Sequence, residues 1–189
     1  AEARSLELQS WLEGIDIDLR SQAENPTVLS ALRGFGEAWN TLEGDQTSYL
    51  KTWYIDDNPN APGSKHKLDY AADGSAYSQV HKLYHGYFRQ LVEEKGYDDV
   101  FVFSLSGDLI YSVFKEQDFA TNFLEGDYAE TGLGRVLRQS LEATESGVHF
   151  TDFEIYAPSN GAAAAFLSAP ILDRRGVLRG VIAFQMPAD

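Results

Sequence analysis

Two histidines four residues apart, His81 and His85, are the first side chains in this sequence that could do chemistry. On a helix this spacing places both rings on one face, where they could bind one zinc ion. Residue 82 is a lysine, however, where a zinc protease carries glutamate, and the spacing supplies no third ligand. His81 also belongs to a helical stripe of tyrosines, which favours a packed and hydrogen-bonded ring. We therefore expect no metal site.

Motifs for nucleotide binding or nucleophilic catalysis are missing from the sequence. The segments Gly34–Gly36 and Gly132–Gly134 lack the third glycine and the preceding strand of a dinucleotide site. No Gly-x-Ser-x-Gly motif occurs, and no histidine is expected beside Ser104, Ser106 or Ser168 in the sheet. The absence of cysteine excludes a thiolate nucleophile. These observations predict a protein that is not an enzyme and holds no cofactor.

Acidic side chains dominate the composition. Of the 189 residues, 29 are acidic and 15 are basic, which gives a net charge of −14. Such a charge disfavours binding to nucleic acid and to anionic lipid. Hydrophobic residues make up 43% of the chain, as in globular domains. The longest apolar run, residues 161–172, is 12 residues long and is therefore too short to cross a bilayer.

The first half of the chain is predicted to be helical. Apolar residues recur at helical spacing from Leu8 to Leu19, Val28 to Trp39, Tyr49 to Tyr54 and Tyr77 to Leu91. Between the last two helices, residues 56–73 consist largely of turn-forming residues without an apolar period. A connection of this length inside a compact domain is often functional, so this segment is a candidate partner-facing loop.

After Gly96 the apolar period changes from 3.6 to 2, which predicts strands. We expect a hairpin of strands over 100–105 and 109–114, a helix over 133–141, and three strands over 148–156, 162–172 and 177–185. These strands are apolar on both faces, so both faces of the sheet should be covered. Residues 116–146 would cover one face and the N-terminal helix the other, with a ligand cavity beneath the shorter elements.

Several segments together resemble the Cache superfamily, the PAS-like extracytoplasmic sensor domains of bacterial transmembrane receptors. Segments 97–103 and 107–113 resemble the first hairpin of that family. Segment 114–122 is similar to a branch found in methyl-accepting chemotaxis proteins and in some cyclases and kinases. Segments 53–60, 65–69, 152–159, 165–171 and 180–187 fit the same branch. Amino-acid-binding members carry an Arg-x-Trp-Tyr box, whereas Lys51 begins the corresponding box here, so an amino-acid ligand is not carried over.

The resemblance implies an α+β fold: a five-stranded antiparallel PAS-like sheet with helices on both faces and a long N-terminal helical region. It divides the chain into a helical region, residues 1–48, and a sensor domain, residues 49–189. The implied protein is the periplasmic part of an inner-membrane receptor, most similar to a methyl-accepting chemotaxis protein. A histidine kinase or a cyclase is the alternative. The receptor would be a homodimer, would bind a small molecule, and would meet the membrane only through flanking spans outside this sequence.

For the ligand site we expect side chains that share a face of the central strands. An anionic ligand would use Lys115 near Asp118, whereas an amine would prefer Asp118 or Asp152 between aromatic walls. Ordinary core packing and a structural ion pair between Lys115 and Asp118 are the alternatives. The predicted ligand-binding residues are Tyr111, Lys115, Asp118, Phe150, Asp152, Tyr156, Phe166 and Ser168.

A function of another class also fits the sequence. A PAS-like domain with a filled core could bind a periplasmic protein through residues 56–73 without any small ligand. A thermal-shift screen distinguishes the two, because a ligand that binds only the folded state raises the melting temperature.

Overall fold

The structure, a computed structural model, describes residues 2–188 apart from the side chain of Leu8. Residues 1 and 189, the outer ends of the two predicted regions, lie outside it. The described helices are α1 (Glu2–Ala23), α2 (Pro26–Thr41), α3 (Gln46–Lys51), α4 (Ala76–Lys95) and α5 (Gly132–Glu142), with short helical turns η1 (Thr52–Asp56), η2 (Lys65–Lys67) and η3 (Ala157–Ser159). The strands are β1 (Asp99–Phe103), β2 (Leu109–Ser112), β3 (His149–Ile155), β4 (Ala163–Leu172) and β5 (Leu178–Met186).

The five strands form one antiparallel sheet in the order β2-β1-β5-β4-β3. The last strand therefore lies at the centre, between the first strand and the fourth. This arrangement confirms the predicted α+β fold with a five-stranded antiparallel PAS-like sheet. Each predicted strand and helix is present, with ends that differ from the predicted ones by a few residues.

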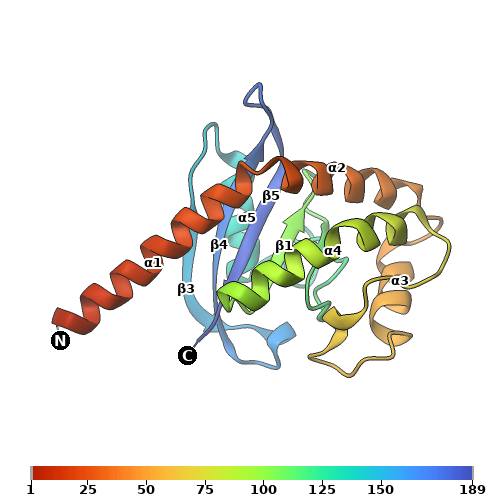
Figure 1. Cartoon of the computed structure of the whole chain (residues 1–189), viewed down its shortest axis with the longest axis horizontal. Coiled ribbons are helices and arrows are strands. Elements are labelled where there is room, and N and C mark those ends of the chain that lie inside the picture. Colours follow the sequence, from red (N-terminus) through yellow and green to blue (C-terminus); the bar gives the residue numbers. More distant parts are fainter. Residues whose placement is uncertain (1, 189) are drawn as a thin grey trace.

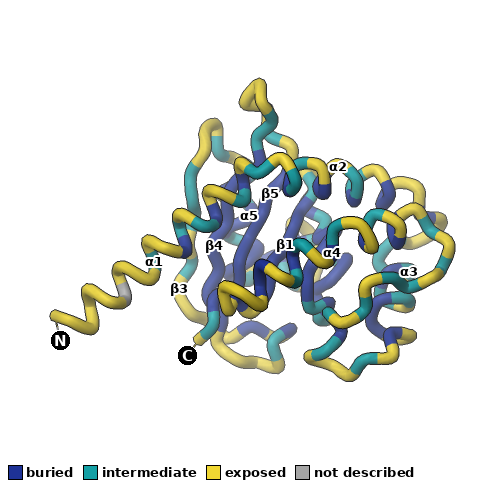
Figure 2. The backbone as a smooth tube through the Cα atoms, viewed as in Figure 1, coloured by how far each residue is buried: buried dark blue, intermediate teal, exposed yellow. Residues whose placement is uncertain are grey.

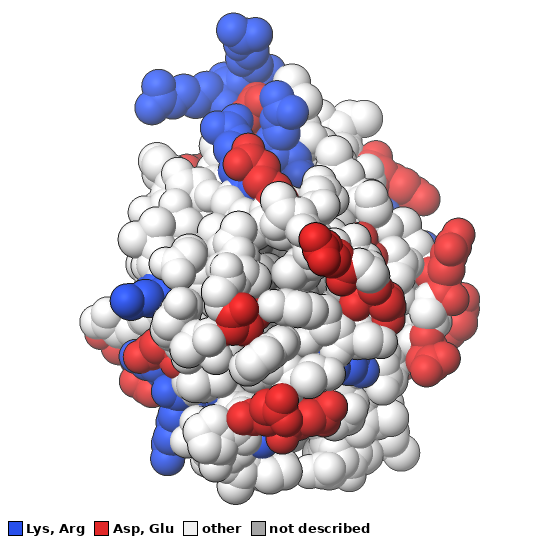
Figure 3. Space-filling model, turned by 90° about the vertical axis from the view of Figure 1, so that its right-hand side faces the viewer, with Lys and Arg blue, Asp and Glu red and all other residues white. Residues whose placement is uncertain are grey.

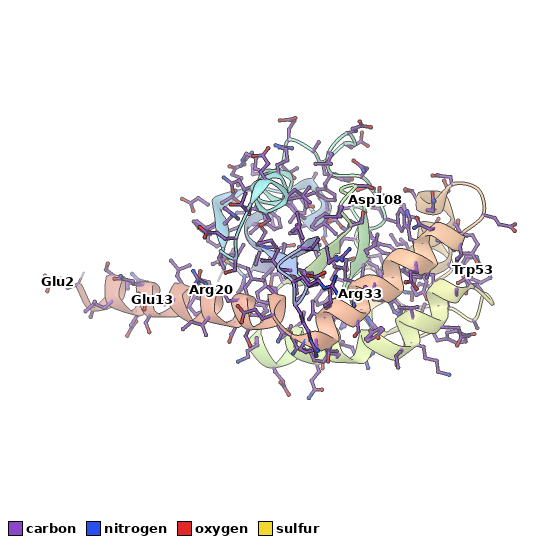
Figure 4. The ribbon with its side chains drawn as sticks, turned by 90° about the horizontal axis from the view of Figure 1, so that it is seen from above. Glu2, Glu13, Arg20, Arg33, Trp53 and Asp108 are labelled. Carbon is purple, nitrogen blue, oxygen red and sulfur yellow. The ribbon has the colours of Figure 1, made fainter. Side chains whose placement is uncertain are left out.

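Helices cover both faces of the sheet, as the apolar strands require (Figure 4). α5 packs on one face, over a core that contains Phe101, Phe103 and Phe166. α1, α2 and α4 pack on the opposite face, over a core that contains Val100 and Val102. We call these the α5 face and the helical face. Figure 2 shows β1, β2, β4 and β5 as deeply buried, whereas β3 at the sheet edge is mostly exposed.

Local sequence explains where the helices begin and end. The Asn25 side chain accepts a hydrogen bond from the Thr27 backbone, and Pro26 occupies the first turn of α2. Ser75 caps α4 in the same way, and Gly96 ends it in the left-handed conformation that glycine adopts at little cost. Turn-forming residues in the sequence therefore determine where α2 and α4 of the helical face begin and where α4 ends.

α1 extends beyond the sheet at its N-terminal end (Figure 1), and its exposed side chains there include Leu6. Its C-terminal half joins the helical face through Ile15 and Leu19. Side chains from residues 1–48 and 49–189 share this core, and the boundary between the two regions stays a prediction. None of the described helices combines the length and apolar content that crossing a bilayer requires.

The close approach of α2 to the sheet depends on Gly180. A Cβ atom on Gly180 would lie 2.6 Å from the Phe103 carbonyl oxygen and 2.8 Å from a methyl carbon of Leu32. The Gly180→Ala variant should therefore lower the free energy of unfolding by about 1–3 kcal/mol. Gly86→Ala is the matched control, because nothing lies within 4 Å of its added Cβ and alanine favours the helix by about 0.5–1 kcal/mol. Urea unfolding of both variants tests this; equal stability of the two would contradict it.

Candidate functional site

The segment that follows β2 brings three ionisable side chains into the interior. Lys115 and Asp118 are almost completely buried, and Glu116 lies between them in the chain. The segment passes around the sheet edge at β2, so its side chains enter the two faces separately. Thr47 of α3 holds it in place by donating a 2.5 Å hydrogen bond to the Ala120 carbonyl. The segment from 113 to 120 therefore connects both cores.

Asp118 lies on the α5 face beside aromatic rings. The Tyr156 hydroxyl donates a 2.6 Å hydrogen bond to Asp118 Oδ2. The Tyr156 ring meets Phe166 edge to face, with centroids 4.9 Å apart. Burial raises the pKa of Asp118 to about 6, although the Tyr156 hydrogen bond opposes this shift. The structure thus brings together three of the predicted site residues: Asp118, Tyr156 and Phe166.

Asp99 is a buried carboxyl that sequence reasoning did not identify as a site residue. Its Oδ1 accepts hydrogen bonds from the backbone N–H groups of Val100 at 2.8 Å and Val113 at 3.0 Å. Burial raises the pKa of Asp99 well above its usual range, and the charges of Asp118 and Glu116 raise it further. A sequence signal for it existed, because a charged residue at the start of an otherwise apolar strand is unusual.

Two carboxyl oxygens and one hydroxyl in this region have no hydrogen-bond partner among the described residues. They are Oδ2 of Asp99, Oδ1 of Asp118 and Oγ of Ser112. Ser112 pairs with Phe101 across β1 and β2, which directs its side chain to the α5 face. Buried polar atoms are normally hydrogen-bonded, since an unsatisfied one costs about 1–3 kcal/mol. Together with Thr151 Oγ1, which lies beneath α5, these atoms are the chemically unexplained feature of the α5 face.

A chain of hydrogen bonds runs from this region to the end of β5. Gln185 Nε2 donates to Ser159 Oγ at 2.9 Å, and Ser159 Oγ donates to Glu116 Oε2 at 3.2 Å. Burial raises the pKa of Glu116 to about 7, and the Asp118 charge adds to the shift. Gln185 is the residue before the last one of β5. Charge changes at Glu116 and Asp118 are therefore connected to the C-terminal strand.

Lys115 and Tyr111 lie on the helical face, away from Asp118. Among the described residues Lys115 forms no ion pair, so the structural pair with Asp118, which was the alternative to a ligand site, is absent. Burial lowers the pKa of Lys115 to about 7, and the nearby Asp99 charge opposes this shift. The expectation that Tyr111 and Lys115 share a face with Tyr156 and Phe166 is wrong, because Tyr111 of β2 belongs to the core of the helical face, where Lys115 lies against it, and Tyr156 and Phe166 belong to that of the α5 face.

Phe150 and Asp152 of β3 are also displaced from the predicted surface. Phe150 is opposite Leu167 in the register and Thr151 is opposite Phe166, so Phe150 and Phe166 point to different faces. A register shift between Thr151 and Glu154 breaks the simple alternation that the prediction assumed. Phe150 is 47% exposed and Asp152 is exposed. Neither Phe150 nor Asp152 therefore lies with Asp118, Tyr156 and Phe166 on the α5 face.

Ser168 is buried beneath α5 and is fully hydrogen-bonded. Its hydroxyl donates to the Val136 carbonyl at 2.7 Å and lies 2.7 Å from the Ser140 hydroxyl. These bonds tie β4 to α5. Ser168 therefore lies on the predicted face, with its hydrogen-bonding capacity used by the helix that covers it.

The expected cavity on the α5 face is not found among four described cavities of about 210–550 Å³. None of the four is lined by any of the eight predicted residues. Large rings fill this face instead, including Phe101, Phe103, Phe123 and Phe166. The prediction of a hollow there is therefore not confirmed, and any ligand at Asp118 must be small or must displace a ring.

Two of the cavities flank the turn between β4 and β5, where Lys and Arg side chains gather at one end of the molecule (Figure 3). One, of about 500 Å³, contains Arg33 and Arg179 but also Glu37 and Asp108. Arg33 on α2 and Asp108 after β1 lie on either side of it (Figure 4). The other, of about 450 Å³, likewise has two basic and two acidic lining residues. Neither cavity therefore favours a ligand of one charge.

His81 and His85 hold the segment between η1 and α4. His81 Nδ1 donates to the Asp69 carbonyl at 2.8 Å, and His85 Nε2 donates to the His66 carbonyl at 2.6 Å. The Tyr111 hydroxyl donates to the remaining nitrogen of His85 at 2.6 Å. Burial lowers the pKa of both histidines, that of His85 to about 2. The rings therefore act as neutral hydrogen-bonding groups, and no three His, Asp or Glu side chains in residues 2–188 could hold a metal ion.

Asn58 completes the anchoring of residues 56–73. Its side-chain amide donates to the carbonyl of Tyr54 at 2.9 Å and to that of Lys65 at 3.1 Å, and Lys65 Nζ donates back to the Asn58 carbonyl at 3.0 Å. The predicted partner-facing loop is thus fastened to the helical face from inside. The sequence identified residues 56–73 only by their turn-forming residues, and such residues do not indicate against which part of the fold a segment packs.

No protein-family model matches the chain, and no curated protein matches it significantly. Among solved structures it is similar to the sensor domain of the V. cholerae histidine kinase DctB, with 16% identity and a TM-score of 0.44 over 84% of this chain. An extracellular ligand binding receptor from Desulfohalobium retbaense has 12% identity and a TM-score of 0.38 over 82%. This chain spans 54% of the former structure and 24% of the latter. At these TM-scores neither likeness establishes a shared function.

The raised pKa of Asp118 predicts a specific dependence of stability on pH. Between about pH 4 and pH 6 the folded state holds a proton that the unfolded chain has released, so the free energy of unfolding falls as the pH rises. The Asp118→Asn variant should lack this loss, which amounts to about 2–3 kcal/mol. Urea unfolding from pH 4 to pH 7 measures it.

Asp127→Asn is the control, because Asp127 is an exposed carboxyl in the same connection. Its pH profile should follow that of the wild type. Identical slopes for Asp118→Asn and the wild type would show that Asp118 titrates normally and would contradict the burial argument.

Proposed function

We propose that this chain is the extracytoplasmic sensor domain of a bacterial transmembrane signalling receptor of the Cache superfamily. In this proposal it binds a small ligand without catalysing a reaction. Its PAS-like strand order supports this function, as does the sequence resemblance over residues 49–187. The two ends of the described chain lie toward the same side of the molecule (Figure 1), so flanking segments could enter one membrane.

We further propose that the ligand carries an ammonium group and binds at Asp118 and Asp99. The observation that carries this proposal is the set of three buried atoms without partners: Oδ2 of Asp99, Oδ1 of Asp118 and Oγ of Ser112. An ammonium group has three hydrogen-bond donors and one positive charge, and would therefore donate to these acceptors and balance the charge of one carboxylate. Asp152 is exposed and offers no comparable site.

The aromatic rings favour the same ligand class. Tyr156 and Phe166 stand beside Asp118, and ring faces attract cations. Because large rings fill the α5 face, the ligand must be compact. An anion is disfavoured here, since two buried carboxyl groups would repel it and Lys115 lies on the other face.

Signal transmission would pass through β5. Gln185 is linked through Ser159 to Glu116, which lies two residues from Asp118. A cation at Asp118 would lower the pKa of Glu116 and so change the charge at the end of this hydrogen-bond chain. Shifts of about 1–2 Å at helix interfaces are typical of such signals. The receptor would be a homodimer that pairs through α1, and a methyl-accepting chemotaxis protein is the output that we favour.

A thermal-shift assay with matched variants tests the ligand proposal. We expect ethanolamine, putrescine or tyramine to raise the melting temperature of the wild type in a saturable manner, whereas acetate and succinate should not. Asp118→Asn should lose the response, because it removes the charge that attracts the ammonium group. Asp152→Asn should retain it, because Asp152 lies exposed on β3.

Two results would overturn this proposal. A response to succinate that survives in Asp118→Asn would indicate an anion site elsewhere. A complete lack of response to all five compounds would indicate that the α5 face is a filled core whose unpartnered atoms bind ordered water.

A further inference from the structure

The Lys115 side chain ends deep inside the helical face. The residue is 2% exposed, and its Nζ donates a hydrogen bond to the Ser112 carbonyl. No carboxylate of the described chain lies within ion-pair distance of Nζ. A buried ammonium group is costly unless other groups compensate its charge.

Three aromatic rings contribute to that compensation, beside the nearby Asp99 carboxyl group. Nζ lies 4.4 Å from the ring centroid of Tyr111, 5.2 Å from that of Phe119 and 5.7 Å from that of Tyr54. All three distances fall within the range of about 6 Å in which a ring face attracts a cation. The rings come from β2, from the segment after it and from η1, so tertiary folding assembles them independently of Lys115.

Two of the rings are held in place by their own hydroxyl groups. The Tyr111 hydroxyl lies 2.6 Å from His85 Nδ1, and the Tyr54 hydroxyl lies 2.7 Å from Ser78 Oγ. Phe119 is fully buried. The ring faces are therefore preorganised around the ammonium group and do not depend on the lysine for their orientation.

The backbone at Lys115 gives a second indication that the head group is held. Its φ is 55°, in the left-handed region that glycine adopts readily and lysine rarely does. A residue persists in such a conformation when the surrounding structure fixes it. The Lys115 side chain contributes the Nζ hydrogen bond to the Ser112 carbonyl and the contacts with the three rings.

We propose that Tyr54, Tyr111 and Phe119 form a binding site for a primary alkylammonium group, in which Lys115 is the intramolecular ligand. This site is separate from the one proposed at Asp118, on the other face of the sheet. Removal of the Lys115 side chain should leave the rings in place and open the site to a free alkylammonium ion. The ion that reproduces the lysine side chain from Cβ onward is n-butylammonium.

The Lys115→Gly variant tests this, because glycine tolerates the positive φ. We expect it to melt below the wild type, and n-butylammonium to raise its melting temperature in a saturable way. 1-Butanol, which has the same carbon chain without the charge, should raise it much less. Lys115→Met is the matched control: its uncharged side chain fills the site, so n-butylammonium should shift it less than Lys115→Gly. Because both variants retain Asp118, binding at that residue contributes equally to both.

An equal effect of 1-butanol and n-butylammonium on Lys115→Gly would overturn the proposal, since it would indicate an apolar cavity without preference for a cation. A folded Lys115→Gly that responds to neither compound would also overturn it. NMR of the wild type decides the matter if that variant does not fold. The Hε protons of Lys115 should resonate upfield of those of the other lysines because of ring currents from the three rings. Unshifted Hε resonances would contradict the proposed site.

Discussion

The loss of water around the segment after β2 is the physical constraint on which the rest depends. Helices cover both faces of the sheet, so side chains that turn inward at its edge leave the solvent completely. Lys115 and Asp118 are only three residues apart, yet they enter opposite faces and cannot neutralise each other. Burial then moves both pKa values toward neutrality, downward for the amine and upward for the acid. The segment after β2 therefore places a buried amine on the helical face and a buried carboxyl group on the α5 face.

The two faces answer this constraint in different ways. On the helical face, three rings and a backbone carbonyl surround the Lys115 ammonium group, and the face also contains two neutral histidines that fasten residues 56–73. On the α5 face, the acids retain oxygens without partners. The helical face holds its buried amine with the chain's own groups and leaves only ring nitrogens of His66 and His81 without partners, whereas the α5 face leaves carboxyl oxygens without partners beside β5, the strand that leads to the C-terminal end. This asymmetry supports recognition at Asp118 and a structural role for the other side.

Sequence periodicity was sufficient to predict the elements, because each strand and helix carries its own apolar pattern. The fifth strand, predicted over 177–185, is found at Leu178–Met186. The site was predicted less well. Asp118, Tyr156 and Phe166 meet as expected, but Phe150 lies on the other face, because β3 pairs Phe150 with Leu167 and Thr151 with Phe166. His81 is a packed and hydrogen-bonded ring, as predicted, but its partner could not be predicted, because that partner is the backbone carbonyl of Asp69, which no side-chain pattern reports. The site could therefore be predicted only in part, because it depends on contacts between segments that are distant in the sequence.

The most direct measurement is a carboxyl ¹³C NMR titration of Asp118 in the wild type, without and with saturating ethanolamine. Without the amine, we expect a midpoint near pH 6, because burial raises the pKa of Asp118. With the amine, we expect a midpoint at least one unit lower, because a bound ammonium group favours the carboxylate. A midpoint that is the same in both samples would contradict ammonium recognition at Asp118.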